Sequence, residues 1–276
     1  MSSASEEQSP APRIPATVIQ SMWIGAEISN LERLGLTSFV ANGHVVHLYL
    51  YDDVAGIPRG VVVRDANEVV PQDRIFTTRA GSVAPFSDWF RQELLYQKGG
   101  YWVDLDVICL RPFDFTDDVV VGLEGPAITC NAVLKFPAGH WLTRSLADLA
   151  RQPNTVMPYD GLGMIVRKAA RKYLRGNRPG DVLWGESAGP VGLTRALMHH
   201  DLLGCAKPPT AFYPINSTDW RSIFYRNDPN ALDALDDSYA VHLWNEMGRR
   251  TTGFDKNATF PPDSLIEQLK RRYVGG

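Results

Sequence analysis

Residues 87–107 read SDWFRQELLYQKGGYWVDLDV, and this stretch decides which fold the rest of the chain can adopt. At the beginning of this stretch, and at the residue before it, apolar residues recur three and four positions apart, as on one face of a helix. They are Phe86, Trp89, Phe90 and Leu94. Gly99-Gly100 can end that helix. The residues from 101 to 110 are rich in β-forming types, so we predict a strand directly after the helix.

The same alternation of strand and helix continues on both sides of this stretch. We predict further strands at 16–25, 44–51, 59–65, 119–124, 130–136 and 238–245, and helices at 30–41, 66–70, 85–98, 140–152, 164–175 and 191–200. Such alternation is typical of an α/β fold built on a sheet. We expect one domain over 14–276, with a helical excursion at about 140–200, preceded by a disordered tail at 1–13.

The composition is that of an ordinary globular protein, with 44% hydrophobic residues and a net charge of −3. This balance gives no general attraction for nucleic acid, so neither DNA nor RNA is an expected partner. The 3 cysteines have no CxxC spacing, which favours a reducing compartment over a disulfide framework or a thiolate zinc site. The sequence also has no signal-peptide pattern and no apolar run of about 18 residues that could span a membrane. We therefore expect a cytoplasmic protein.

Asp104 and Asp106 are two carboxylates placed two residues apart in an otherwise apolar strand. Side chains at that spacing point to the same face of a strand, and burying two anionic groups together is costly without a cation. A hard divalent cation such as Mn²⁺ or Mg²⁺ suits these oxygen ligands and often completes its shell with phosphate oxygens. The pair therefore indicates a metal site for a nucleotide-linked substrate, with solvated carboxylates at a strand end as the alternative.

Asp88 and Arg91 lie three residues apart on the preceding helix and share one of its faces. A guanidinium can clamp phosphate or sugar hydroxyls with two hydrogen bonds, and a carboxylate accepts hydrogen bonds from sugar hydroxyls. The alternative is a surface ion pair. The helix is therefore predicted to direct both groups toward the strand that carries Asp104.

Together, the Asp88–Arg91 pair, the Gly99-Gly100 turn and the Asp104–Asp106 pair resemble the sugar-binding region containing DxD of family-32-type glycosyltransferases. That group includes fungal initiating mannosyltransferases, α-1,4-galactosyltransferases, bacterial capsule enzymes and the glucosylating domains of large bacterial toxins. Weaker similarities extend along the chain at Trp23-Ile-Gly, Asn131-Ala and residues 240–245. The resemblance implies a GT-A fold, in which one Rossmann-like nucleotide-sugar-binding domain has a mixed sheet flanked by helices.

The resemblance also implies roles for individual residues. Asp106 would hold the metal, usually Mn²⁺, and Asp104 would contact ribose or sugar, which makes both of them the catalytic candidates. The donor-binding residues implied are Trp23, Asp88, Arg91, Tyr101, Asn131, Trp244 and Asn245, with Trp23 stacking on the base and the Trp244 indole N–H donating to a phosphate. His242 is either a further metal or diphosphate ligand or a packed core residue, and a neutral imidazole suits Mn²⁺.

These residues predict a metal-dependent, retaining glycosyltransferase that moves a hexose from a UDP- or GDP-sugar to a hydroxyl of a glycan or lipid-linked acceptor, as in polysaccharide biosynthesis. A metal at Asp106 would act as a Lewis acid on the departing diphosphate. The sequence names no convincing covalent nucleophile. A GT-A module that binds a nucleotide sugar without transferring it is the alternative.

A competing pattern is Gly185-Glu186-Ser187-Ala188-Gly189, which satisfies the GxSxG of esterases and has His242 downstream. It would make the chain a serine hydrolase. The context is poor, because Pro190 follows at once and no oxyanion segment precedes it.

The predicted helix at 164–175 carries five basic residues on one flank: Arg167, Lys168, Arg171, Lys172 and Arg175. Such a flank could hold anionic lipid or a lipid-linked acceptor by peripheral contact with a membrane. A solvated charged face is the alternative.

Overall fold

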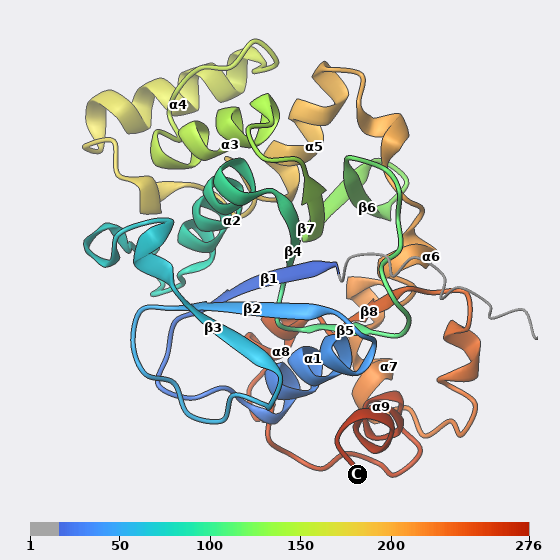
Figure 1. Cartoon of the computed structure of the whole chain (residues 1–276). Coiled ribbons are helices and arrows are strands. Elements are labelled where there is room, and N and C mark those ends of the chain that lie inside the picture. Colours follow the sequence, from blue (N-terminus) through green and yellow to red (C-terminus); the bar gives the residue numbers. More distant parts are fainter. Residues whose placement is uncertain (1–16, 276) are drawn as a thin grey trace, which may run out of the picture.

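The computed structural model describes residues 17–275, so the tail predicted at 1–13 lies outside the described residues. The main sheet has six strands in the order β3-β2-β1-β4-β7-β6 (Figure 1). Their bounds are β1 Val18–Trp23, β2 Val45–Leu50, β3 Val61–Asp65, β4 Gly100–Val103, β6 Val120–Gly125 and β7 Ile128–Phe136. The first four are parallel to one another, whereas β7 runs antiparallel to both β4 and β6. The sheet is therefore mixed.

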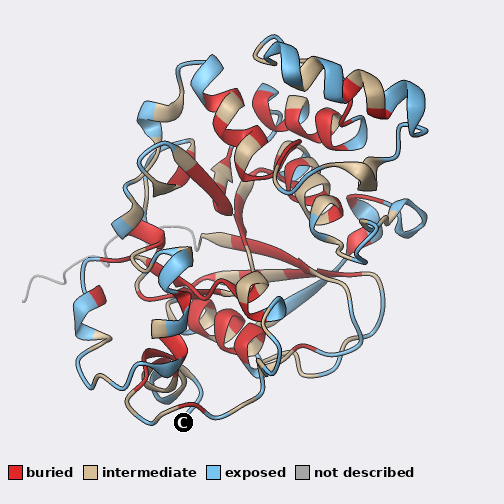
Figure 2. Ribbon diagram, turned by 180° about the vertical axis from the view of Figure 1, so that it is seen from behind, coloured by how far each residue is buried: buried red, intermediate tan, exposed pale blue. Residues whose placement is uncertain are grey.

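Helices cover both faces of the sheet and enclose two apolar cores (Figures 1 and 2). One face carries α2 (Ala84–Lys98), α3 (Trp141–Arg151) and α5 (Pro190–His199), with α4 (Leu162–Leu174) outside them. The other side holds α1 (Asn30–Ala41), α6 (Pro209–Phe212), α7 (Trp220–Tyr225), α8 (Asn245–Arg249) and α9 (Leu265–Tyr273). The predicted α/β class, a mixed sheet flanked by helices, is confirmed.

The strand predicted at 101–110 is in fact two strands, so that part of the sequence analysis is wrong. β4 ends at Val103, and β5 (Val107–Cys109) leaves the main sheet to pair with β8 (Ala240–His242) in a separate two-stranded sheet. Asp104 and Asp106 lie in the turn between β4 and β5, where the Val107 N–H donates to the Asp104 carbonyl at 3.1 Å. The two carboxylates therefore converge because they lie in a tight turn. They are not brought together by the alternation of side chains along a continuous strand.

Buried ion pairs hold α4 against the rest of the excursion. Lys168 Nζ lies 2.7 Å from Asp160 Oδ2, and the Arg171 guanidinium makes two hydrogen bonds to the Glu186 carboxylate at 2.7 and 2.8 Å. Both basic side chains are about 5% exposed or less. The predicted five-residue basic flank is therefore wrong for Lys168 and Arg171, because each has a buried carboxylate partner that the helical spacing could not reveal.

None of the helices among residues 17–275 combines the length and the hydrophobicity that crossing a bilayer would require.

Replacing Glu186 by Gln should lower the free energy of unfolding by about 3 kcal/mol, because it leaves Arg171 buried without a counter-charge. Urea denaturation measures the loss. The matched control is Arg144→Gln, which removes the exposed Arg144–Asp148 pair and should cost about 0.5 kcal/mol or less. Equal effects of the two substitutions would contradict a structural role for the buried pair.

The same pair predicts a pH dependence of stability. Burial disfavours the ionised Glu186 carboxylate, but the hydrogen bond and charge of Arg171 outweigh it and lower the pKa of Glu186. A carboxyl group whose pKa is lower in the folded protein than in the unfolded protein, where it is about 4.3, stabilises the fold at pH values above that unfolded pKa. This stabilisation is lost as the pH falls through the folded pKa. The stability difference between the parent protein and the Glu186→Gln variant should therefore be largest near neutral pH and shrink below about pH 4. A difference that stays constant from pH 7 into the acid range would contradict this assignment.

Candidate functional site

A cavity of about 730 Å³ opens where the parallel strands of the main sheet end. Its walls come from the turn after β4, the start of α2, the segment before α5 and the residues around α8. Seven of the residues predicted from the sequence line it: Asp88, Arg91, Asp104, Asp106, Asn131, His242 and Trp244. The structure thus brings together groups that are up to about 150 positions apart in the sequence.

The position of His242 beside Asp106 follows from the pairing of β5 with β8. Val107 is opposite His242 in that ladder, and the Leu243 N–H donates to the Asp106 carbonyl at 2.8 Å. His242 Nε2 then lies 3.2 Å from Asp106 Oδ1. The other carboxylate oxygen, Oδ2, accepts a hydrogen bond from the Asn245 N–H at 2.8 Å. Asp106 is therefore fixed from two sides.

The two groups shift each other's pKa strongly. Burial alone would raise the pKa of Asp106, but His242 outweighs it and lowers that pKa to about 2. Burial alone would lower the pKa of His242, but Asp106 outweighs it and raises that pKa well above its usual range. In the protein without a metal, an imidazolium is therefore the counter-charge of the Asp106 carboxylate.

The chemistry of these donors fits a divalent metal. One ligand atom each from Asp104, Asp106 and His242 can be chosen so that all lie within 4.8 Å of one another. Two ligands at right angles, each about 2.1 Å from an ion, are about 3 Å apart, which is close to the Asp106–His242 distance of 3.2 Å. His242 Nδ1 is buried and has no hydrogen-bond partner among the described residues. Two carboxylates and one imidazole suit Mn²⁺ or Mg²⁺, and the nitrogen favours Mn²⁺.

Arg91 is the centre of a second group of contacts in the same cavity. Its Nη1 lies 3.1 Å from Asp104 Oδ1, and its Nη2 lies 3.5 Å from Asp88 Oδ1. Arg91 Nη1 also donates to the Asn131 carbonyl, and the Asn131 amide donates to Asp88 Oδ1 at 2.7 Å. Burial raises the pKa of Asp88, although Arg91 and Asn131 act against it. The pair predicted on the helix is therefore buried and connected to the DxD turn, and it is not a surface ion pair.

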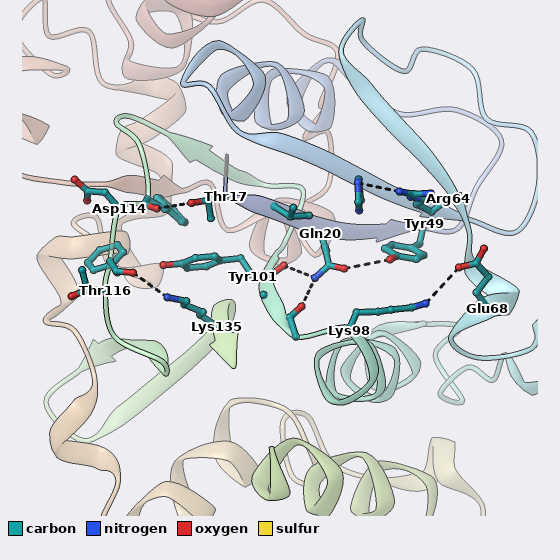
Figure 3. A pocket seen from close by; sticks show the side chains of 16 residues that line it. Thr17, Gln20, Tyr49, Arg64, Glu68, Lys98, Tyr101, Asp114, Thr116 and Lys135 are labelled. Atoms are coloured by element: carbon teal, nitrogen blue, oxygen red, sulfur yellow. Dashed lines mark hydrogen bonds and ion pairs between the residues drawn. The ribbon is translucent and has the colours of Figure 1, made fainter. Parts of the chain in front are cut away.

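Trp102 contacts the DxD turn, although the sequence analysis named only its neighbour Tyr101. The Trp102 indole N–H donates to Asp104 Oδ1 at 2.7 Å, and the Arg91 guanidinium lies 5.0 Å from the Trp102 ring centre. Neighbouring side chains point to opposite sides of a strand, so Tyr101 faces away from this cavity. It lines another cavity of about 760 Å³, where Gln20 donates to the carbonyl of Tyr101 at 3.3 Å (Figure 3). The structure therefore does not bring Tyr101 to the DxD turn.

Three other predicted donor-binding residues lie near the site but not as expected. The Trp244 indole N–H donates to the Ile215 carbonyl at 2.8 Å, so in this structure it is engaged within the protein. Asn245 contacts Asp106 through its backbone N–H, while its side-chain amide donates to Glu32. Trp23 does not line the cavity, and Lys256 Nζ lies 5.8 Å from the centre of its ring.

Two arginines on and after α8 also line the cavity and were missed. Arg249 and Arg250 both bind the Glu246 carboxylate, at 2.7 and 2.9 Å, and these contacts outweigh burial to lower the pKa of Glu246. They are partly exposed guanidiniums at the mouth of a cavity that is also lined by the carboxylates of Asp88, Asp104 and Asp106. Their spacing of three and four residues from Glu246 was the available signal.

The esterase pattern at 185–189 is not a nucleophile elbow. The residues directly before it, 182–184, do not form a strand, and Ser187 is buried. Glu186 is bound by Arg171, and His242 lies beside Asp106. A nucleophile elbow needs an exposed serine on a strand-to-helix turn, so the serine hydrolase prediction is wrong.

Comparison with known proteins supports the resemblance. Residues 203–273 match the family described as "Alpha 1,4-glycosyltransferase conserved region", and this segment contains His242 and the α8 arginines. Lactosylceramide 4-alpha-galactosyltransferase of Mus musculus is 29% identical over 201 residues, which cover 68% of this chain and 46% of that protein. Alpha-1,4-N-acetylglucosaminyltransferase of Homo sapiens is 22% identical over 201 residues, covering 68% of this chain and 49% of that protein. The chain is thus homologous to proteins named as glycosyltransferases, as the DxD region predicts.

The chain spans about half the length of these curated relatives. Among solved structures, "PaToxG Glycosyltransferase" is similar with a TM-score of 0.45 and 18% identity, over 67% of this chain and 69% of that one. "WbbM bifunctional glycosytransferase apo structure" is similar with a TM-score of 0.34 and 14% identity, over 96% of this chain and 53% of that one.

The affinity for Mn²⁺ should rise with pH, by up to about tenfold per pH unit between pH 6 and 8, because a metal ligand must lose the proton that Asp106 holds on His242. Isothermal titration with MnCl₂ in two buffers of different ionisation enthalpy measures the affinity and the proton release together. The control is His242→Gln, which should bind more weakly and with little pH dependence. Proton-free binding to the parent protein would contradict the assignment of His242 as a ligand.

Proposed function

We propose that this chain is a metal-dependent, retaining glycosyltransferase that transfers a hexose from a UDP- or GDP-sugar to a hydroxyl of a glycan or a lipid-linked acceptor. The observation that carries the proposal is the convergence of Asp104, Asp106 and His242 in one cavity with the buried Asp88–Arg91 pair. The homologous relatives are named for the transfer of galactose and of N-acetylglucosamine, which is consistent with a sugar-transferring enzyme.

The metal would be held by Asp106 and His242, with Asp104 as a third donor. A divalent ion there supplies Lewis-acid stabilisation of the negative charge on a departing diphosphate. The Asn245 N–H and the Leu243 N–H keep Asp106 oriented toward the cavity. Because these contacts come from a rigid ladder and a helix start, the ligands are placed before the donor binds.

Asp88 and Arg91 would orient the transferred sugar. Their side chains are 13% and 6% exposed, and they face the cavity together with Asn131. In this arrangement Arg91 neutralises part of the charge of Asp88 and Asp104, while free carboxylate oxygens accept hydrogen bonds from sugar hydroxyls. Holding the sugar at a fixed angle to the acceptor is the contribution of these residues to the rate.

Arg249 and Arg250 would contact the diphosphate from the cavity mouth. They lie there with their charges only partly neutralised by the single carboxylate of Glu246. Guanidiniums bind phosphate oxygens with paired hydrogen bonds, and they would complement a metal on the opposite side of the same group.

Asp106→Asn should lower the rate of hexose transfer by at least about a hundredfold, because the variant loses an anionic metal ligand at the point where charge develops. Release of nucleoside diphosphate from UDP- or GDP-hexoses, with and without acceptor sugars, measures the rate. Ser187→Ala is the matched control and should keep full activity. If Ser187→Ala abolished turnover and Asp106→Asn did not, the proposed transfer mechanism would be refuted.

Thermal unfolding with UDP or GDP, each with Mn²⁺ or with EDTA, should show a metal-dependent rise in Tm with one of the nucleotides. A ligand at 100 times its Kd stabilises by about 2.7 kcal/mol, which is a shift of about 5 °C or more for a domain of this size. Asp106→Asn should remove the metal-dependent part of the shift. A shift without turnover on any hexose would instead identify a binding module without transferase activity.

A further inference from the structure

The side of α4 that faces solvent is apolar, while the side that faces the protein carries charge. Leu162, Val166 and Tyr173 are 84%, 68% and 76% exposed, and Leu174 next to them is 82% exposed. With about 3.6 residues per turn, the first three lie within about 40° of one another around the helix. The inward side holds Lys168 and Arg171 in buried ion pairs. A surface helix of a soluble protein normally has the opposite arrangement.

Within residues 152–189, the segment that contains α4, every exposed charged side chain is positive. Residues 152–189 contain three acidic side chains, Asp160, Asp181 and Glu186, each 7% exposed or less and each in an ion pair. The same segment exposes four basic side chains, and none of them takes part in an ion pair within residues 17–275: Arg167, Lys172, Arg175 and Arg178. The protein as a whole has a net charge of −3, so this positive surface is a local feature.

We propose that this surface, formed by Leu162, Val166, Tyr173 and Leu174 with the basic residues Arg167, Lys172 and Arg175, docks on a bilayer that contains anionic phospholipid. We call it the α4 docking face. Its apolar side chains would enter the headgroup region, where burial of apolar area favours binding. Arg167 and Lys172 flank this apolar stripe on its two sides, and Arg175 follows at the end of the helix. These basic side chains would contact the anionic headgroups, each adding about a fivefold factor to binding. An anionic bilayer complements both properties of the face.

A second copy of the chain complements the face less well. A symmetric contact places the same patch on both subunits, so basic residues of one copy would lie near those of the other. Like charges brought together in this way oppose association. The apolar residues would favour binding of either a bilayer or a second copy. The positive charge favours only the anionic bilayer.

The α4 docking face is attached rigidly to the rim of the candidate site. Arg171 binds Glu186, and the Glu186 carboxylate also accepts a hydrogen bond from the Leu183 N–H at 3.1 Å. Trp184 follows in the chain, is 58% exposed and lines the 730 Å³ cavity. A bilayer bound to α4 would therefore lie close to one side of the cavity mouth.

Sedimentation of the full chain with lipid vesicles tests the proposal. The vesicles are of phosphatidylcholine alone or of equal parts phosphatidylcholine and phosphatidylserine, at low and at physiological ionic strength. We expect binding to the serine-lipid vesicles that weakens with salt, and little binding to phosphatidylcholine alone. The double variant Leu162→Ser, Val166→Ser should bind at least about tenfold more weakly. The triple variant Arg167→Gln, Lys172→Gln, Arg175→Gln should bind about a hundredfold more weakly.

Matched controls exist elsewhere on the surface. Val63→Ser with Met198→Ser changes side chains that are 53% and 57% exposed, and Arg59→Gln with Arg221→Gln removes exposed charges. These variants should bind vesicles as the parent does, and all variants should keep the parent's Tm because every changed side chain is exposed. Absence of vesicle binding, equal binding to both lipid mixtures, or equal losses in the control variants would overturn the proposal. So would a concentration-dependent dimer that Leu162→Ser, Val166→Ser dissociates. The readout is independent of nucleotide binding and turnover, so it can fail while the proposed function stands.

Discussion

The main constraint on the site is the free-energy cost of placing three aspartate carboxylates in one partly enclosed cavity. Asp88, Asp104 and Asp106 line the same cavity, and a buried charge without a partner is strongly destabilising. Each of them therefore has a cationic neighbour fixed by the fold. Arg91 lies between Asp88 and Asp104, and His242 lies against Asp106. In the proposed metal site, the His242 imidazolium would give up its proton when an ion binds, whereas the Arg91 guanidinium would stay charged.

This constraint explains why distant segments meet at the turn after β4. α2 buries Phe86, Phe90 and Leu94 against the sheet, and that packing turns Asp88 and Arg91 toward the end of β4. On the other side, the two-stranded sheet of β5 and β8 brings a segment from near the end of the chain to Asp106. The candidate site residues thus lie at the junction between the two apolar cores.

Local periodicity predicted most of the framework, and long-range pairing explains what it missed. The helix predicted at 30–41 has those bounds, and its start is marked by the capping box of Ser29 and Glu32. The helix predicted at 85–98 begins one residue earlier, and it is marked by a proline in its first turn, an apolar face and Gly99 at its end. The break between β4 and β5 was not predicted, since the partner of β5 lies more than a hundred residues away. Trp102 was not predicted either, because the sequence does not show which side of the strand faces Asp104.

The side of α4 that faces the protein could not be predicted from the sequence. Both sides of this helix carry basic and apolar residues, so spacing alone cannot say which side faces inward. The inward side is set by Asp160 and Glu186, which bind Lys168 and Arg171 in the folded protein. Both acidic residues lie outside the helix, so the spacing of residues along the helix could not reveal these contacts. Burying those ion pairs is at best weakly favourable compared with apolar packing. The helix therefore leaves Leu162, Val166 and Tyr173 in solvent without an evident gain in stability, and an outward apolar face of this kind is best explained by a surface that covers it.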